Sequence, residues 1–122
     1  MGDGRVLART MDVRSNESIA AALADLPAEF QAIDILFNNA GLALGLGKAQ
    51  EADLDDWETM IETNVAGLAR VTHAVLPGMV ARNRGDVLNV SSVSYQGCLT
   101  NVRKHCFVVY HNRSVSTERN FQ

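Results

Sequence analysis

The chain has 122 residues, of which 47% are hydrophobic and 20% charged, a composition typical of one folded domain rather than a disordered segment. Its formal net charge of −3 offers no basic surface for nucleic acid or an anionic membrane. No apolar stretch is long enough to span a bilayer, and the N-terminus lacks the basic-then-apolar pattern of a secretory signal. Cys98 and Cys106 form neither a CxxC motif nor a metal-ligand spacing, which favours reduced thiols and a cytoplasmic location.

The first predicted elements are a strand and a helix. The strand runs from Val6 and ends at Asp12-Val13. Ser15 or Asn16 can then cap a helix by accepting a backbone N–H. The apolar residues that follow recur at the spacing of one helical face, which ends before Pro27: Ile19, Ala22, Leu23 and Leu26.

A second strand is predicted at residues 33–38, where Ile33, Ile35, Leu36 and Phe37 make a short, almost continuous apolar run. Such a run is typical of a strand that is buried on both faces in a parallel sheet. It stops at two amides, Asn38 and Asn39, which are followed by the small residues Ala40 and Gly41. This ending lets another molecule approach the backbone at the carboxyl end of a parallel strand, where open α/β sheets bind ligands.

Three glycines follow in the stretch Gly41-Leu-Ala-Leu-Gly45-Leu-Gly47, which invites interpretation as a phosphate-binding loop. That fingerprint requires a helix that begins at the glycines, so that its N-terminal N–H groups face the phosphates. Here residues 48–52 intervene before the next helical pattern, and no strand-end acid follows at about 20 residues. A mobile loop is therefore the preferred interpretation.

A long helix is predicted from residue 54. Four carboxylates crowd its start: Glu51, Asp53, Asp55 and Asp56. Carboxylates at this end interact favourably with the helix dipole, so capping is preferred over metal binding. Six residues share one face of the helix: Trp57, Ile61, Asn64, Leu68, Val71 and Val75. Because a buried amide without a partner costs about 1–3 kcal/mol, Asn64 is either a satisfied structural residue or part of a polar site.

The third strand is predicted at residues 86–92, with Val87, Leu88 and Val90 as its apolar members. A strand, a long helix and a strand form a right-handed βαβ unit by default, so the strands at 33–38 and 86–92 should lie parallel. Their carboxyl ends then share one edge of the sheet. Asn38–Gly41 and Ser91–Ser92 are expected to converge there, with Asn64 arriving from the helix.

The residues at these strand ends resemble a known family, the short-chain dehydrogenase/reductases. The resemblance covers Gly4 to Ser92 and rests on Asn38-Asn-Ala-Gly41, on Thr63-Asn-Val-Ala-Gly67 and on the serines that end the third strand. It implies an α/β fold with a Rossmann-like, doubly wound parallel sheet. Residues 1–92 would form a partial dinucleotide-binding domain with strands 3 to 5 of that sheet, lacking the first βαβ half. Residues 93–122 are expected to be a divergent or frameshifted tail.

The resemblance also implies roles for individual residues. Asp12 and Val13 resemble the strand-end pair that meets the adenine of the cofactor, and Asn38, Asn39, Ala40 and Gly41 resemble the segment beside its ribose. Asn64 resembles the asparagine that holds a water in the family's proton relay. Ser92 resembles the catalytic serine that hydrogen-bonds the substrate carbonyl. No metal is implied.

Three stretches are most similar to one branch of the family, which oxidises 3-hydroxy acids such as serine, usually with NADP: Asn38–Gly45, Asp56–Met60 and Val75–Val80. The chain is therefore expected to be a fragment of an NAD(P)-dependent oxidoreductase that interconverts a 3-hydroxy acid and its 3-oxo product. The resemblance also implies that full-length relatives are homo-oligomers through the helix at 54–76.

Two parts of the family pattern do not occur in this sequence, namely a Gly-x-x-x-Gly-x-Gly loop and a Tyr-x-x-x-Lys motif after the serine. Neither Lys48 nor Lys104 has a tyrosine four residues before it, so neither Tyr95 nor Tyr110 belongs to such a motif. The isolated chain is therefore expected to lack dehydrogenase activity. The alternative function is that of an inactive relic, which would act at most as an interaction partner.

Overall fold

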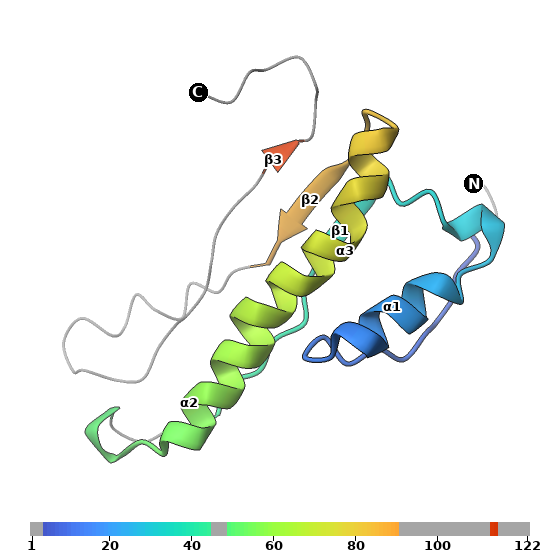
Figure 1. Ribbon diagram of the computed structural model, residues 1–122. Helices are drawn as coiled ribbons and strands as arrows, with labels where there is room; N and C mark the ends of the chain where they lie inside the picture. Colours follow the sequence, from blue (N-terminus) through green and yellow to red (C-terminus); the bar gives the residue numbers. More distant parts are fainter. Residues whose placement is uncertain (1–3, 45–48, 91–112, 115–122) are drawn as a thin grey trace.

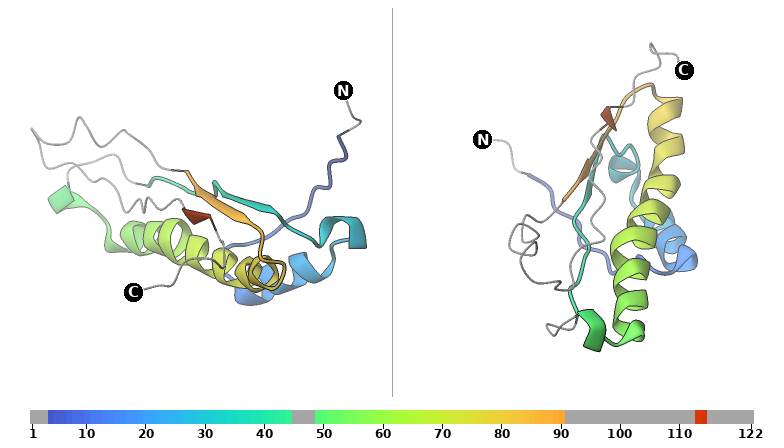
Figure 2. Two further views of the ribbon diagram at one scale, coloured as in Figure 1. Left: turned by 90° about the horizontal axis from the view of Figure 1, so that it is seen from above. Right: turned by 90° about the vertical axis from the view of Figure 1, so that its left-hand side faces the viewer.

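The computed structural model describes residues 4–44, 49–90 and 113–114 (Figure 1). One layer of helices lies on one face of a short sheet, and a view from above shows α1 and the long helix side by side below the strands (Figure 2, left). The elements are α1 (Asn16–Ala24), η1 (Ala28–Phe30), β1 (Ile35–Asn38), η2 (Ala49–Glu51), α2 (Leu54–Ile61), η3 (Glu62–Gly67), α3 (Leu68–Ala81), β2 (Asp86–Asn89) and β3 (Arg113–Ser114). Within the described residues no helix is both long and apolar enough to cross a membrane.

The predicted parallel βαβ unit is confirmed. β1 and β2 pair parallel with Ile35 opposite Asp86 and Asn38 opposite Asn89, so both strands end at the same edge. The sheet order is β1-β2-β3, and β3 pairs antiparallel with β2. Both long strands are shorter than predicted, because regular pairing covers only residues 35–38 and 86–89.

The strand predicted from Val6 to Val13 is wrong, since residues 4–13 form no ladder with any described residue. A strand requires a partner whose N–H and C=O groups face its own. Apolar composition alone does not give burial, and Val6 is 93% exposed. The C-terminal end of this extended segment is instead hydrogen-bonded to α1, where the Asp12 N–H donates to Ser18 Oγ at 2.9 Å.

The helix predicted after Ser15 is confirmed as α1. Ser15 is its N-cap and accepts a hydrogen bond from the Ser18 N–H at 3.2 Å. Ile19 is fully buried against the long helix, and Leu23 packs beside it. The apolar face predicted from the sequence is therefore the face that α1 buries.

The long helix consists of three consecutive pieces, α2, η3 and α3, and it continues through Pro77. Asp53 caps it by accepting from the Asp55 N–H at 3.0 Å, as the acidic start predicts. The middle piece, η3, is π-helical, a geometry that the sequence pattern does not indicate. The buried face steps by four through both η3 and α3, at Thr63, Gly67, Val71, Val75 and Met79.

The predicted helix face is confirmed only in part. Val71 and Val75 are buried as expected, whereas Ile61 is 37% exposed. The core consists of Ile19, Val71, Val75, Met79 and Val87. The prediction that the strand at 33–38, now β1, is buried on both faces is also wrong within the described residues. Ile35 and Phe37 are 64% and 61% exposed. Only the face of β1 that carries Leu36 packs against the core.

Candidate functional site

The carboxyl ends of β1 and β2 are joined by side-chain amides. Asn38 Nδ2 donates to Asn89 Oδ1 at 2.9 Å and to Thr72 Oγ1 of α3 at 3.0 Å. Thr72 Oγ1 in turn donates to the Leu68 carbonyl at 2.8 Å. One half-buried amide therefore connects both strands to the helix that crosses between them, and this fixes the edge of the sheet.

The next three residues, Asn39, Ala40 and Gly41, are exposed. At Gly41 a Cβ atom would lie 3.4 Å from Asn64 Oδ1, within van der Waals contact, so the backbone of Gly41 lies beside that amide. The small side chains of Ala40 and Gly41 leave the backbone accessible to a ligand on one side and close to the helix on the other.

Asn64 is hydrogen-bonded to the backbone that follows Gly41. Its Oδ1 accepts from the Leu42 N–H at 2.8 Å, and its Nδ2 donates to the Leu42 carbonyl at 2.8 Å. The amide therefore has the partners that its half-buried position requires. It lies in the π-helical stretch η3, and such stretches are frequent at functional sites.

Sequence reasoning missed Met60 as a member of this region. Its Sδ accepts from the Leu44 N–H at 3.3 Å, two residues beyond the contact of Asn64 with the same loop. A methionine in an apolar pattern gives no sign of a polar contact, because its thioether is only a weak acceptor. Its position four residues before Asn64, and so on the same side of a helix, is the one signal that could have identified it.

Asp12 and Val13 reach the same helix from the N-terminal segment. Val13 packs on Gly67 of η3, where a Cβ atom would lie 2.7 Å from Val13 Cγ2. The Asp12 carboxylate is exposed and accepts from Arg14, at Oδ1 from the backbone N–H at 2.9 Å and Nε at 3.0 Å, and at Oδ2 from Nη2 at 3.0 Å. These hydrogen bonds from Arg14, together with its positive charge, lower the pKa of Asp12.

Of the three groups expected to converge at this edge, the structure brings Asn38–Gly41 beside Asn64. The third group, Ser91–Ser92, lies outside the described residues. Val13 packs on the same helix at Gly67. Amides, backbone groups and one exposed carboxylate can bind a polar ligand through hydrogen bonds. Among the described residues, no group of three His, Cys, Asp or Glu could hold a metal ion.

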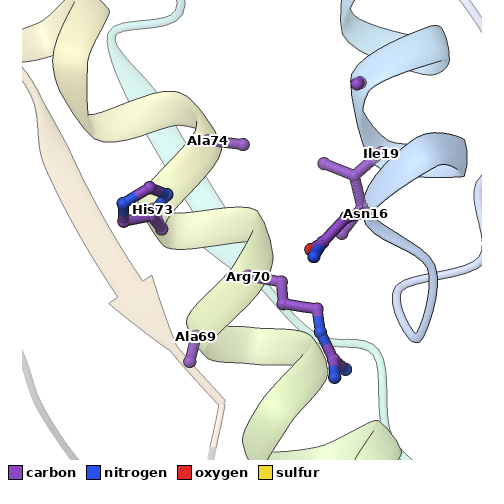
Figure 3. A pocket seen from close by; sticks show the side chains of 7 residues that line it. Asn16, Ile19, Ala69, Arg70, His73 and Ala74 are labelled. Atoms are coloured by element: carbon purple, nitrogen blue, oxygen red, sulfur yellow. The ribbon is translucent and has the colours of Figure 1, made fainter.

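A separate cavity of about 560 Å³ lies between α1 and α3 (Figure 3). Its lining residues are Asn16, Ile19, Ala20, Ala69, Arg70, His73 and Ala74, none of which is a predicted site residue. Arg70 is paired with Glu62 of η3 at 2.6 Å, and His73 is exposed. Because none of its lining residues belongs to Asn38–Gly41 or to β2, the cavity is distinct from the carboxyl edge of the sheet.

The parallel βαβ unit, with amides at its carboxyl edge, defines part of a Rossmann-like α/β fold. A family model described as short chain dehydrogenase matches residues 2–104. The chain is 54% identical over 89 residues to the NADP-dependent 3-hydroxy acid dehydrogenase YdfG of Salmonella typhi, covering 73% of this chain and 36% of that protein. The protein of that name from Escherichia coli K12 is 53% identical over 94 residues, covering 77% and 38%.

Solved structures give the same result. The closed form of serine dehydrogenase complexed with NADP+ matches with a TM-score of 0.67 at 55% identity, covering 70% of this chain and 34% of that one. The chain belongs to the short-chain dehydrogenase family. It spans a little over a third of the length of the curated relatives it matches. The predicted family and fold class are both confirmed.

Proposed function

We propose that this chain carries the central part of an NADP-dependent oxidoreductase that interconverts a 3-hydroxy acid, such as serine, and its 3-oxo product. The observation that carries the proposal is the contact of Asn64 with Leu42, directly after Asn38–Gly41 at the carboxyl edge of the sheet. High identity to proteins named NADP-dependent 3-hydroxy acid dehydrogenase supports the same substrate class.

Asp12, Val13 and the stretch from Asn38 to Gly41 are the proposed cofactor-binding residues. Asp12 offers an exposed carboxylate that can accept a hydrogen bond from the adenine amino group. The exposed backbone at Asn39, Ala40 and Gly41 can pass beside the ribose because no bulky side chain shields it. The packing of Val13 on Gly67 supports a single binding surface, since it brings the adenine-facing segment to the helix of Asn64.

Asn64 and Ser92 are the proposed catalytic residues. NADP, when bound, supplies the nicotinamide that accepts the hydride. Asn64 keeps a second lone pair on Oδ1 and a second N–H on Nδ2 beyond its bonds to Leu42, which allows it to hold a water for proton transfer. Ser92 is proposed to hydrogen-bond the substrate carbonyl, and it follows the last residue of β2, Asn89, by three positions.

The proposal extends to cellular setting and assembly. It places the protein in the cytoplasm, as its two unpatterned cysteines favour. It also assigns the helix at 54–76 to contact between like subunits. The exposed apolar side chains of Leu54 and Ile61 on this helix support that assignment.

A chimera tests the proposed function directly. Residues 4–90 replace the matching segment of the Escherichia coli dehydrogenase, and NADP reduction is followed with serine or 3-hydroxypropionate. We expect activity within about tenfold of the parent, because the segment supplies only part of an otherwise intact site. Asn64→Ala in the chimera should lower kcat about 10²–10⁴-fold, the usual size of acid–base catalysis, whereas Asn16→Ala should not.

The 122-residue chain provides the second arm of the test. Alone it is expected to give no more NADPH than its Ser92→Ala variant, since the tyrosine–lysine pair of the family pattern is not in its sequence. Turnover clearly above that variant would overturn this expectation. A chimera that folds but does not turn over substrate would instead favour the inactive relic.

A further inference from the structure

The loop after Gly41 does not leave the molecule but follows the long helix. Leu42 contacts Asn64 through both its N–H and its carbonyl, and the Leu44 N–H donates to Met60 Sδ. The chain beyond β1 runs along the side of α2 and η3, toward the start of α2 (Figure 2, right). Loop and helix therefore run in opposite directions, with Leu42 beside Asn64 and Leu44 beside Met60.

The spacing of these two contacts follows from backbone geometry. Residues four apart on a helix lie on the same side and are separated by about 6 Å along its axis. Residues two apart in an extended chain point the same way and are separated by about 6.6 Å. An extended loop can therefore meet positions 64 and 60 with its residues 42 and 44. We name the pair Met60 and Asn64 the loop clamp.

The two halves of the loop clamp differ in chemistry. Asn64 makes two short bonds that fix both polar groups of Leu42. Met60 offers one sulfur lone pair to a half-buried backbone N–H, where a leucine of similar volume would fill the space without accepting. Without the Met60 acceptor, the hydrogen bonds that join the described residues 42–44 to the helix would be those of Leu42 with Asn64.

We propose that Met60 is a positioning residue for the cofactor-facing segment of the site. Together with Asn64 it holds residues 42–44 against the helix, and this fixes Gly41 at its close approach to Asn64 Oδ1. The inference rests on the proposed function only for what the segment faces. The loop clamp itself rests on the contacts, so it can fail or hold independently of dehydrogenase activity.

Amide hydrogen exchange of the isotope-labelled 122-residue chain tests this inference by NMR. In Met60→Leu the Leu44 amide should exchange about five- to tenfold faster, the size expected for one net hydrogen bond. The Leu42 amide should change by less than about twofold, because Asn64 still holds it. Met60→Gln restores an acceptor on a side chain of similar length, so it should return Leu44 to within about twofold of the native rate.

Met79→Leu is the matched control, because Met79 is fully buried and contacts Gly85 within the core. It should speed exchange of core amides without changing the ratio of the Leu44 rate to the Leu42 rate. If Met60→Leu acts in the same uniform way, Met60 only packs and the proposal is wrong. The native chain alone also decides, since protection of the Leu44 amide below about fivefold would overturn the proposal even if Met60→Leu failed to fold.

Discussion

The two halves of the long helix are held in place by different kinds of interaction. The α3 half packs through Val71, Val75 and Met79 against α1 and the sheet. The α2–η3 half is held by hydrogen bonds to the loop at Leu42 and Leu44 and by the close contact of Gly67 with Val13. Burial therefore accounts for one end of the helix, and specific partners distant in sequence account for the end that faces the candidate site.

The largest effect is expected in the α3 half, at Met79. This side chain has 0% exposure, so Met79→Ala removes buried volume that its neighbours can refill only in part. We expect the free energy of unfolding to fall by about 2–5 kcal/mol, measured by urea denaturation. Val80→Ala is the control, since Val80 is 50% exposed and the same measurement should change by less than about 0.5 kcal/mol. Equal losses in both variants would contradict the placement of the core.

In the η3 half the sharpest test is Gly67→Ala. A Cβ atom there would lie 2.7 Å from Val13 Cγ2 and 3.3 Å from the Val13 carbonyl oxygen, so the N-terminal segment must shift. We expect a loss of about 1–3 kcal/mol from overpacking, although alanine is the better helix former. Gly78→Ala is the matched control because its Cβ would meet only the flexible end of Arg82, at 3.2 Å. A stable Gly67→Ala variant would show that Val13 does not pack there.

Asn38 lies between the two halves and should show a smaller effect. Asn38→Ala removes the hydrogen bonds to Thr72 and Asn89 at the carboxyl edge of the sheet. We expect a loss of about 1–2 kcal/mol in the free energy of unfolding. The neighbouring Asn39→Ala, at an exposed position, should stay within about 0.5 kcal/mol of the native value. Indistinguishable losses would mean that the amide does not connect strands and helix.

The same comparison explains what the sequence could predict. Period and turn residues are local signals, so they were sufficient for α1 with its Ser15 cap, for the parallel βαβ unit and for the buried Val71 and Val75. Asn64 stood out because an amide in an apolar face requires partners. The backbone of Leu42 as its partner could not be predicted, since no local pattern specifies which distant group fills that requirement.

The errors have a common physical cause. The stretch from Val6 to Val13 has the composition of a strand, but a ladder depends on a neighbouring strand that its own residues do not specify. The same dependence left Ile35 and Phe37 exposed on one face of β1. The π-helical stretch was also missed, and its residues Asn64 and Gly67 make tertiary contacts, with Leu42 and Val13, that no local pattern specifies.

The smallest expected effect concerns Asp12, an exposed residue next to Val13, which packs on the α2–η3 half. Hydrogen bonds and charge from Arg14 hold the pKa of Asp12 below its ordinary value. Because the pKa of Asp12 is lowered in the folded chain, the stabilisation by its pairing with Arg14 is present above the unfolded pKa and is lost as pH falls through the folded pKa.

Arg14→Ala should therefore raise the pKa of Asp12 toward its ordinary value, so that the carboxylate is protonated at a higher pH. An NMR titration of the Asp12 carboxyl carbon through the acid range measures this shift. Arg9→Ala is the control because Arg9 pairs with Asp25, at 2.6 Å, and should leave the Asp12 titration unchanged. If Asp12 titrates at the same pH with and without Arg14, the pair does not form in solution, and the proposed adenine-facing carboxylate is not oriented by it.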